Sequence, residues 1–440
     1  MSALLLVLVA LTAFLPACYV ATALPALWLT QNTWLGERAT LLSAGGMEVT
    51  LVDGVIVLLL ARTLVTLYRT RKLVADRALY AALGAFFLVN FLATLAAAVK
   101  FGPGAMPGSL IALARLGSEV ALVPILAQTI ASPTQGRRCV GLLGITLLVL
   151  AVIQFVNFFG ASRGFIIGEV QGMERGEVRY FGPVGDSIGF VLLLGYVVAL
   201  CGARPVGVLL FAGGIVLTAG LGAVFGLGVA TVLVVLFGWK KEVLHGFARR
   251  WLWIIPTLLL VLLVAVATVG RPLAATLLDR VQSGRFQESG GQRKATATMA
   301  LRMIAANPLT GVGFLGYASA LERYGGREFF NLDKIDGGTA NANNQWLQAL
   351  TDSGLPGLCA FVAVAATAAL RLFRTGAGSA DRSLQIFFRG AGLWLGTQLL
   401  GNLAAVWLVP SSYVARLLWV MLGIAIALTR FDAARMTNDQ

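Results

Sequence analysis

The sequence predicts an all-α integral membrane protein that crosses the bilayer about twelve times. Three observations lead to this fold class. The 440 residues are 58% hydrophobic and only 12% charged, whereas a soluble protein carries roughly 25% charged residues. Apolar runs of about 20 residues, the length of a membrane-spanning helix, recur along the whole chain. Lysine and arginine gather in alternate short loops between these runs.

The apolar runs define the candidate spans. They are 3–29, 51–68, 78–98, 109–131, 139–159, 185–202, 206–218, 223–239, 251–269, 355–372, 386–405 and 411–429. The first run has neither a basic start nor a small-residue cleavage site, so we read it as a retained helix rather than a signal peptide. Between the seventh and eighth spans, Gly213, Gly214, Gly220 and Gly222 favour a break over one long helix.

The basic residues orient these helices. If the N-terminus is cytoplasmic, every short loop after an even-numbered span contains Lys or Arg, and the short loops on the other side contain almost none. We therefore expect both termini in the cytoplasm. The chain then divides into nine spans in 1–269, an outer loop domain in 270–350, and three spans with a cytoplasmic tail in 351–440.

The longest polar segment, 271–345, lies on the outer side in this topology. It carries nine basic residues, mostly arginine, against six carboxylates. Membrane orientation does not explain positive charge there, and the forked guanidinium of arginine binds phosphate oxygens in pairs. The segment therefore predicts an anionic ligand, with ordinary surface salt bridges as the alternative. We expect helices over Gln292 to Ala306 and Tyr317 to Arg323, and no strands.

Several charged residues fall inside or beside the apolar runs. Arg115 and Glu119 are four residues apart and can pair on one helix face or lock two helices together. Others lie near span ends, where we expect their side chains to reach the membrane surface. These are Asp53, Asp186, Asp352, Arg389 and Arg416.

Composition argues against several classes of site. The four cysteines lie in or near apolar runs without a CxxC pair, and His245 is the single histidine, so no metal or cofactor is expected. Membrane orientation already accounts for much of the net charge of +14, so nucleic acid is not an expected partner. The glycines at 311, 313 and 316 match a dinucleotide-binding pattern, but no predicted strand precedes them.

Three short segments resemble the O-antigen ligase and polymerase superfamily. They are Arg302–Gly313, Asn343–Gln348 with the following Asp352–Gly357, and Arg179–Gly182. The layout of about twelve spans with the largest outer loop after the ninth is also similar. The resemblance implies a GT-C type fold in the bacterial inner membrane. It implies an inverting, metal-independent transfer of a glycan from undecaprenyl diphosphate, at the periplasmic face, to lipid A–core or to a second glycan lipid.

The resemblance also implies the site residues. The candidates for binding the diphosphate are Arg163, Arg179, Arg280, Arg285, Arg293 and Arg302. We expect the arginines of the outer loop and Arg179 to line one cavity, open to the periplasm, between the bundle and this loop. Asn343 and Asn344 are expected near the acceptor, although helix capping is their alternative role. The family commonly has His-Asn at this pair, and an amide cannot act as a base. Asp336 is the candidate base, with Asp333 and Glu328 as alternatives.

A second departure from the family concerns the seventh span. The family commonly has Ser-Arg-Gly after it, whereas residues 218–223 here contain no arginine. Two other functions therefore stay open. One is a secondary transporter or flippase for an anionic or lipid-linked substrate, which the glycine-rich stretch near 213–222 fits. The other is a non-catalytic relative that binds glycan lipid.

Overall fold

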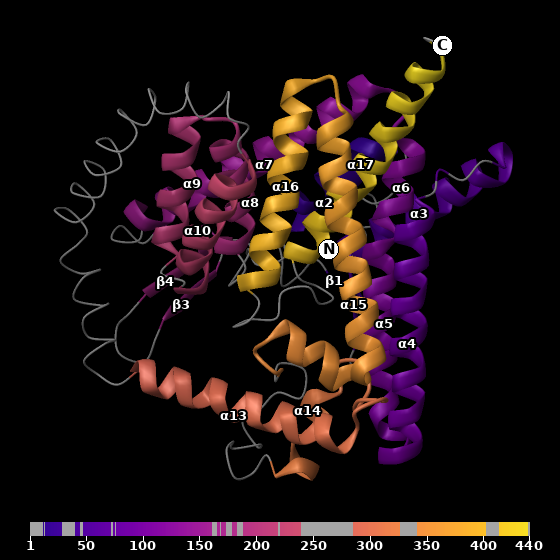
Figure 1. Ribbon diagram of the computed structural model, residues 1–440, viewed down its shortest axis with the longest axis vertical. Coiled ribbons are helices and arrows are strands. Elements are labelled where there is room, and N and C mark those ends of the chain that lie inside the picture. The colour runs from indigo at the N-terminus through magenta and orange to yellow at the C-terminus, as the bar shows by residue number, and fades with distance from the viewer. Residues whose placement is uncertain are drawn as a thin grey trace.

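The computed structural model consists mainly of long helices that run alongside one another (Figure 1). It describes residues 12, 14–28, 40–44, 47–71, 74, 76–160, 165–167, 169–172, 178–182, 188–218, 221–238, 285–325, 341–401 and 413–438. The helices in chain order are α2 (Ala17–Trp28), α3 (Leu51–Thr70), α4 (Arg77–Phe101), α5 (Met106–Val120), α6 (Leu122–Thr129), α7 (Pro133–Gly160), α8 (Ile188–Cys201), α9 (Pro205–Leu217), α10 (Leu221–Leu233), α13 (Arg285–Ala306), α14 (Tyr317–Ala320), α15 (Gln345–Gly378), α16 (Arg382–Gly401) and α17 (Tyr413–Asn438).

Each predicted span that falls on described residues contains helix, and the predicted span 251–269 lies outside them. Five stretches in the described part of the chain are long and apolar enough to cross a membrane: Arg77–Phe101, Met106–Thr129, Pro133–Gly160, Gln345–Gly378 and Val414–Phe431. Three further apolar helices are shorter: Ile188–Cys201, Pro205–Leu217 and Gly222–Phe237. The helical membrane-protein fold is confirmed, while the number of twelve spans stays a prediction.

Local sequence signals account for several helix boundaries. The Asp76 carboxylate accepts the backbone N–H of Leu79 at 3.1 Å and so caps the start of α4. Gly102, with a φ of 97°, ends that helix. The predicted break between the seventh and eighth spans is also present, because α9 ends at Leu217 and α10 begins at Leu221.

Two β-hairpins correct the all-α prediction. Strands β1 (Thr40–Ala44) and β2 (Met47–Thr50) form one antiparallel pair, and β3 (Glu169–Gly172) and β4 (Val178–Gly182) form the other. Both occur in loops predicted on the outer side, where paired strands satisfy backbone groups that are not in helices. Gly45 and Gly46 stand between β1 and β2 in the sequence, and a two-glycine connection between short strands is a hairpin signal.

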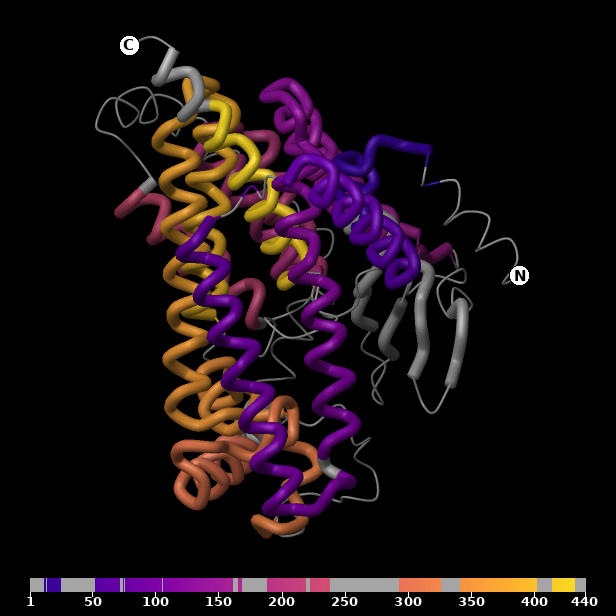
Figure 2. The backbone as a smooth tube through the Cα atoms, turned by 90° about the vertical axis from the view of Figure 1, so that its right-hand side faces the viewer, coloured from indigo at the N-terminus to yellow at the C-terminus, as the bar shows by residue number. Residues whose placement is uncertain are grey.

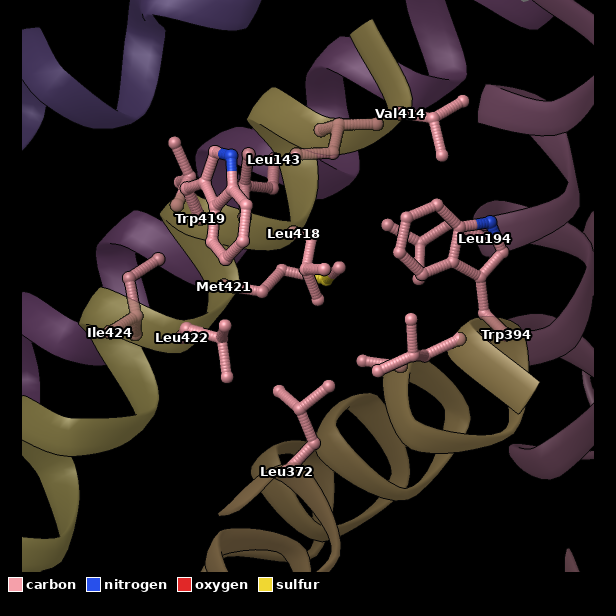
Figure 3. Packing of buried hydrophobic residues seen from close by; sticks show 14 of the residues in the cluster. Leu143, Leu194, Leu372, Trp394, Val414, Leu418, Trp419, Met421, Leu422 and Ile424 are labelled. Carbon is pink, nitrogen blue, oxygen red and sulfur yellow. The ribbon is translucent and has the colours of Figure 1, made fainter. Parts of the chain in front are cut away.

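The main hydrophobic core lies where α7, α8, α15, α16 and α17 approach one another. Figure 3 shows Leu143, Leu194, Leu372, Trp394 and Leu418 around this core, and all five are buried. The indole Nε1 of Trp394 donates a hydrogen bond to the carbonyl of Phe190 at 2.9 Å, so the polar edge of this ring is satisfied.

A buried ion pair crosses the bundle. Glu119 of α5, expected beside Arg115, accepts a hydrogen bond from Nε of Arg416 of α17 at 2.7 Å. The two residues are 3% and 7% exposed. The prediction that Arg416 reaches the membrane surface is therefore wrong, because α17 is enclosed by other helices and the charge finds its partner inside the protein.

Loops predicted on the same side of the membrane meet at the same end of the bundle. At the end with the C-terminus, Arg137 pairs with Asp381 at 3.0 Å and Arg371 pairs with Asp76 (Figure 1). At the opposite end, the Lys100 ammonium bonds the side chain of Asn307. The described contacts therefore support the predicted alternation of loops, and α13 lies at the end predicted to face outward.

Candidate active site

Helix α13 is held by a small core of its own at the end of the bundle predicted to face outward. Met299 and Met303 are fully buried against Val312, Tyr317 and Leu321. The helix begins at Arg285, earlier than the predicted Gln292, and ends at Ala306 as predicted. The short helix predicted from Tyr317 is present as α14 with a following 3-10 turn, Glu322–Tyr324.

The turn after α13 is bound to a kink in α15. Figure 2 shows α15 beside α4 along much of its length, with α13 at the lower end. Helix α15 departs from helical geometry at Ser353 and Gly354. There the backbone N–H of Val312 donates to the carbonyl of Thr351 at 2.8 Å, and the N–H of Leu355 donates to Pro308 at 2.8 Å. Two segments that carry the family resemblance thus form one backbone interface.

Two glycines make this close approach possible. Gly311 has a φ of +63°, and a Cβ there would lie 2.4 Å from the carbonyl of Asp352. Gly354 has a φ of +65°, and its Cβ would lie 2.5 Å from the carbonyl carbon of Leu309. Any larger residue would both strain the backbone and separate the two segments.

Asp352 joins the same interface from inside the kink. It is 3% exposed, and its carboxylate accepts hydrogen bonds from Nε2 of Gln348 at 2.7 Å and from the backbone N–H of Leu315. The side-chain oxygen Oε1 of Gln348 accepts the backbone N–H of Ala342 at 2.8 Å. The expectation that Asp352 reaches the membrane surface is wrong, because the kink turns its carboxylate toward donors within the protein.

Asn343 and Asn344 form the turn that leads into α15. The side-chain oxygen Oδ1 of Asn344 accepts the backbone N–H groups of Trp346 and Leu347 at 2.9 and 3.0 Å, so this residue caps the helix. Asn343 has a φ of 50°, a conformation that asparagine tolerates better than most residues. Its amide nitrogen donates to Oγ1 of Thr296 on α13 at 3.3 Å.

Thr296 connects this turn to an arginine predicted to bind the diphosphate. Its hydroxyl donates to the carbonyl of Arg293, one helical turn earlier, at 2.9 Å. The backbone carbonyl of Thr296 accepts the phenol of Tyr317 at 2.9 Å. Burial raises the pKa of Tyr317 above its usual value, so the phenol remains a neutral donor. The backbone of Arg293 is thus linked to the Asn343 turn through Thr296, and the Arg293 side chain is exposed.

Arg302 belongs to a different group of cations. It follows Arg293 by nine residues, which is about two and a half turns of an α-helix, so the two residues lie on opposite sides of α13. It donates to the carbonyl of Tyr324 at 3.2 Å. The guanidinium of Arg323 lies 4.8 Å from the ring centre of Phe101 and donates to the carbonyl of Lys100 at 3.4 Å. The separation of Arg293 from Arg302 could have been predicted from their spacing in the sequence. The contact of Lys100 with Asn307 could not, because the two residues are 207 positions apart.

For the other predicted site residues, the structure describes only the backbone or nothing at all. Arg285 begins α13, and its side chain is outside the described part. Arg179 pairs with Gln171 in the β3–β4 hairpin, where β4 packs on α7 rather than beside α13. The remaining candidates lie outside the described residues: Arg163, Arg280, Asp336, Asp333 and Glu328. The described side chains contain no cluster of three histidines, cysteines or carboxylates that could hold a metal ion.

The chain is similar to one known protein family over the part that contains this site. Residues 206–362 match the family model described as O-antigen ligase. The matched range includes α13, the Asn343 turn and the kink of α15 that together form the candidate site. No curated protein matches the chain. The predicted resemblance is therefore confirmed at the level of the superfamily.

Proposed function

We propose that this chain, whose residues 206–362 match the O-antigen ligase family model, transfers a glycan from undecaprenyl diphosphate to an acceptor at the periplasmic face. The acceptor is lipid A–core or a second glycan lipid. The contact that joins Asn343 through Thr296 to the Arg293 turn carries this proposal. It links the helix turn that carries Arg293, the cation proposed for the leaving diphosphate, to the pair of residues expected near the acceptor.

The chemistry requires charge stabilisation on the carrier side. Attack by an acceptor hydroxyl on the anomeric carbon breaks the bond to the diphosphate oxygen, which leaves with its negative charge. A guanidinium that is already positioned stabilises this charge as it develops. Arg293 is our first choice because its side chain is exposed and its backbone carbonyl bonds Thr296, which contacts Asn343. The other predicted arginines are proposed to assist. The transfer is inverting and needs no metal ion in this scheme.

The acceptor side requires a proton acceptor. The side chain of Asn343 is an amide and cannot take the proton, and its nitrogen is engaged by Thr296. We therefore assign Asn343 a positioning role, and Asn344 the role of holding the turn as the cap of α15. Asp336 is the proposed base, with Asp333 and Glu328 as alternatives.

In this proposal the protein lies in the bacterial inner membrane with both termini in the cytoplasm. The twelve predicted spans and the outer domain at 270–350 place the site on the periplasmic side. Two observations support this topology: basic loops gather at one end of the bundle, and α13 lies at the other.

The test is a transfer assay with the purified chain in nanodiscs, using an undecaprenyl diphosphate-linked glycan and each acceptor in turn. The natural sequence is compared with Asn343→His. Product from the natural sequence supports the proposal and identifies the acceptor. Product only from the histidine variant, or carrier binding without product from both, would favour a non-catalytic relative. Carrier movement across the bilayer without transfer would favour a flippase.

A further inference from the structure

A groove lies at the end of the bundle opposite the candidate active site. It has a volume of about 550 Å³ and is bounded by α7, α8, α9 and the start of α16. Its walls are largely apolar, and Ile145 and Leu148 on α7 are 59% and 46% exposed. The groove therefore opens on the side of the bundle that would face the lipid, where an acyl chain can enter from the membrane. Its volume is in the range of small-molecule sites.

The shape of the groove depends on two glycines, which have no side chain to fill it. Gly141 and Gly144 lie three residues apart on α7, so they share one helix face, and both line the groove. A Cβ at either position would meet no atom within 4 Å. The open space in front of these glycines thus forms part of the groove, and a larger side chain would occupy it without disturbing the backbone.

The mouth of the groove is cationic. Arg137 and Arg204 line it together with Asp381 and Ser383. Arg137 pairs with Asp381 at 3.0 Å but keeps 58% of its side chain exposed. Within the described part of the chain, the guanidinium of Arg204 makes no hydrogen bond or ion pair. The mouth thus has two cations and one anion, and an unshared guanidinium is available for a phosphate.

From these observations we propose that the groove is a binding site for an anionic glycerophospholipid of the membrane leaflet at this end. One acyl chain lies along Gly141 and Gly144, and the phosphate contacts Arg204 beside Arg137. A basic pocket between membrane helices, on the side rich in arginine loops, is typical of sites for anionic headgroups. The site is independent of the glycan transfer proposed above, because it lies at the opposite end of the bundle.

Native mass spectrometry of the purified chain with added phosphatidylglycerol or phosphatidylcholine tests the proposal. We expect phosphatidylglycerol to be retained preferentially by the unmodified protein. Arg204→Gln should lower its retention about fivefold, the effect of one basic residue near a lipid headgroup. Gly144→Leu should lower retention of both lipids, and Gly141→Leu should repeat this result independently.

Two matched variants control for general effects. Gly84→Leu places the same side chain in open space on α4, since a Cβ there meets nothing within 4 Å. Arg69→Gln removes a cation from the last turn of α3. Both should bind lipid as the unmodified protein does. Equal retention of the two lipids, or equal losses in groove and control variants, would overturn the proposal. So would a dimer that Gly144→Leu dissociates, since a second copy would then occupy this surface.

Discussion

Replacing Gly354 with alanine should separate the turn after α13 from the kink of α15. The backbone there has φ 65° and ψ −162°, a region populated almost only by glycine, where strain for another residue is about 1–3 kcal/mol. The new Cβ would lie 2.5 to 2.7 Å from backbone atoms of Pro308 and Leu309, and overpacking of this kind adds about 1–3 kcal/mol. Together these effects predict a loss of about 2–6 kcal/mol in the free energy of unfolding.

The assay is thermal unfolding in detergent at a fixed scan rate, because membrane proteins often unfold irreversibly. We expect the apparent Tm of Gly354→Ala to fall by about 2–6 °C. Gly84→Ala is the matched control, since it adds the same methyl group to open space on α4 and should leave the Tm unchanged or slightly raised. Gly311→Ala acts on the same interface, so the double variant should lose less than the sum of the two single losses. Equal apparent Tm values for Gly354→Ala and Gly84→Ala would refute the reasoning.

Two further predictions concern stability. Arg416→Met should lower the free energy of unfolding by about 3–5 kcal/mol, because it removes a charged partner from the buried carboxylate of Glu119. Adding Glu119→Gln should recover much of this loss in the same thermal assay, and an additive double variant would contradict the ion pair. Asn344→Ala should cost about 0.5–2 kcal/mol by removing the cap of α15, whereas Asn344→Asp should preserve stability. Equal stability of these two variants would contradict the capping role.

The bundle was largely predictable from the sequence because hydrophobic length and loop charge report directly on membrane helices. The break before Leu221 and the end of α13 were signalled by glycine and proline. The hairpins were missed because short strands in outer loops have no long apolar period, although Gly45 and Gly46 were a usable signal. Thus the elements set by local chemistry were predicted, and those set by pairing of loop segments were less so.

The candidate site was predicted only in part. The motif residues Gly311, Asn344 and Gly354 carry local signals, because capping and positive φ depend on the residue itself. The hydrogen bond between Thr296 and Asn343 joins residues 47 positions apart, and no spacing rule predicts it. Sequence proximity also suggested one cluster for the arginines of α13, whereas helix geometry directs Arg293 and Arg302 to different sides. Burial of Arg416 likewise depends on the helices packed around α17.

The most direct test of the central claim is the rate of glycan transfer by Arg293→Gln compared with Lys294→Gln. Both residues are exposed on α13, and both changes remove one positive charge. Of the two, only Arg293 belongs to the helix turn whose backbone carbonyl bonds Thr296 and so links it to Asn343. We predict that Arg293→Gln lowers kcat by about a hundredfold, as loss of one charge-stabilising donor does, while Lys294→Gln stays within about threefold of the unmodified chain. Equal rates for the two variants, or transfer that is insensitive to Arg293, would contradict the account.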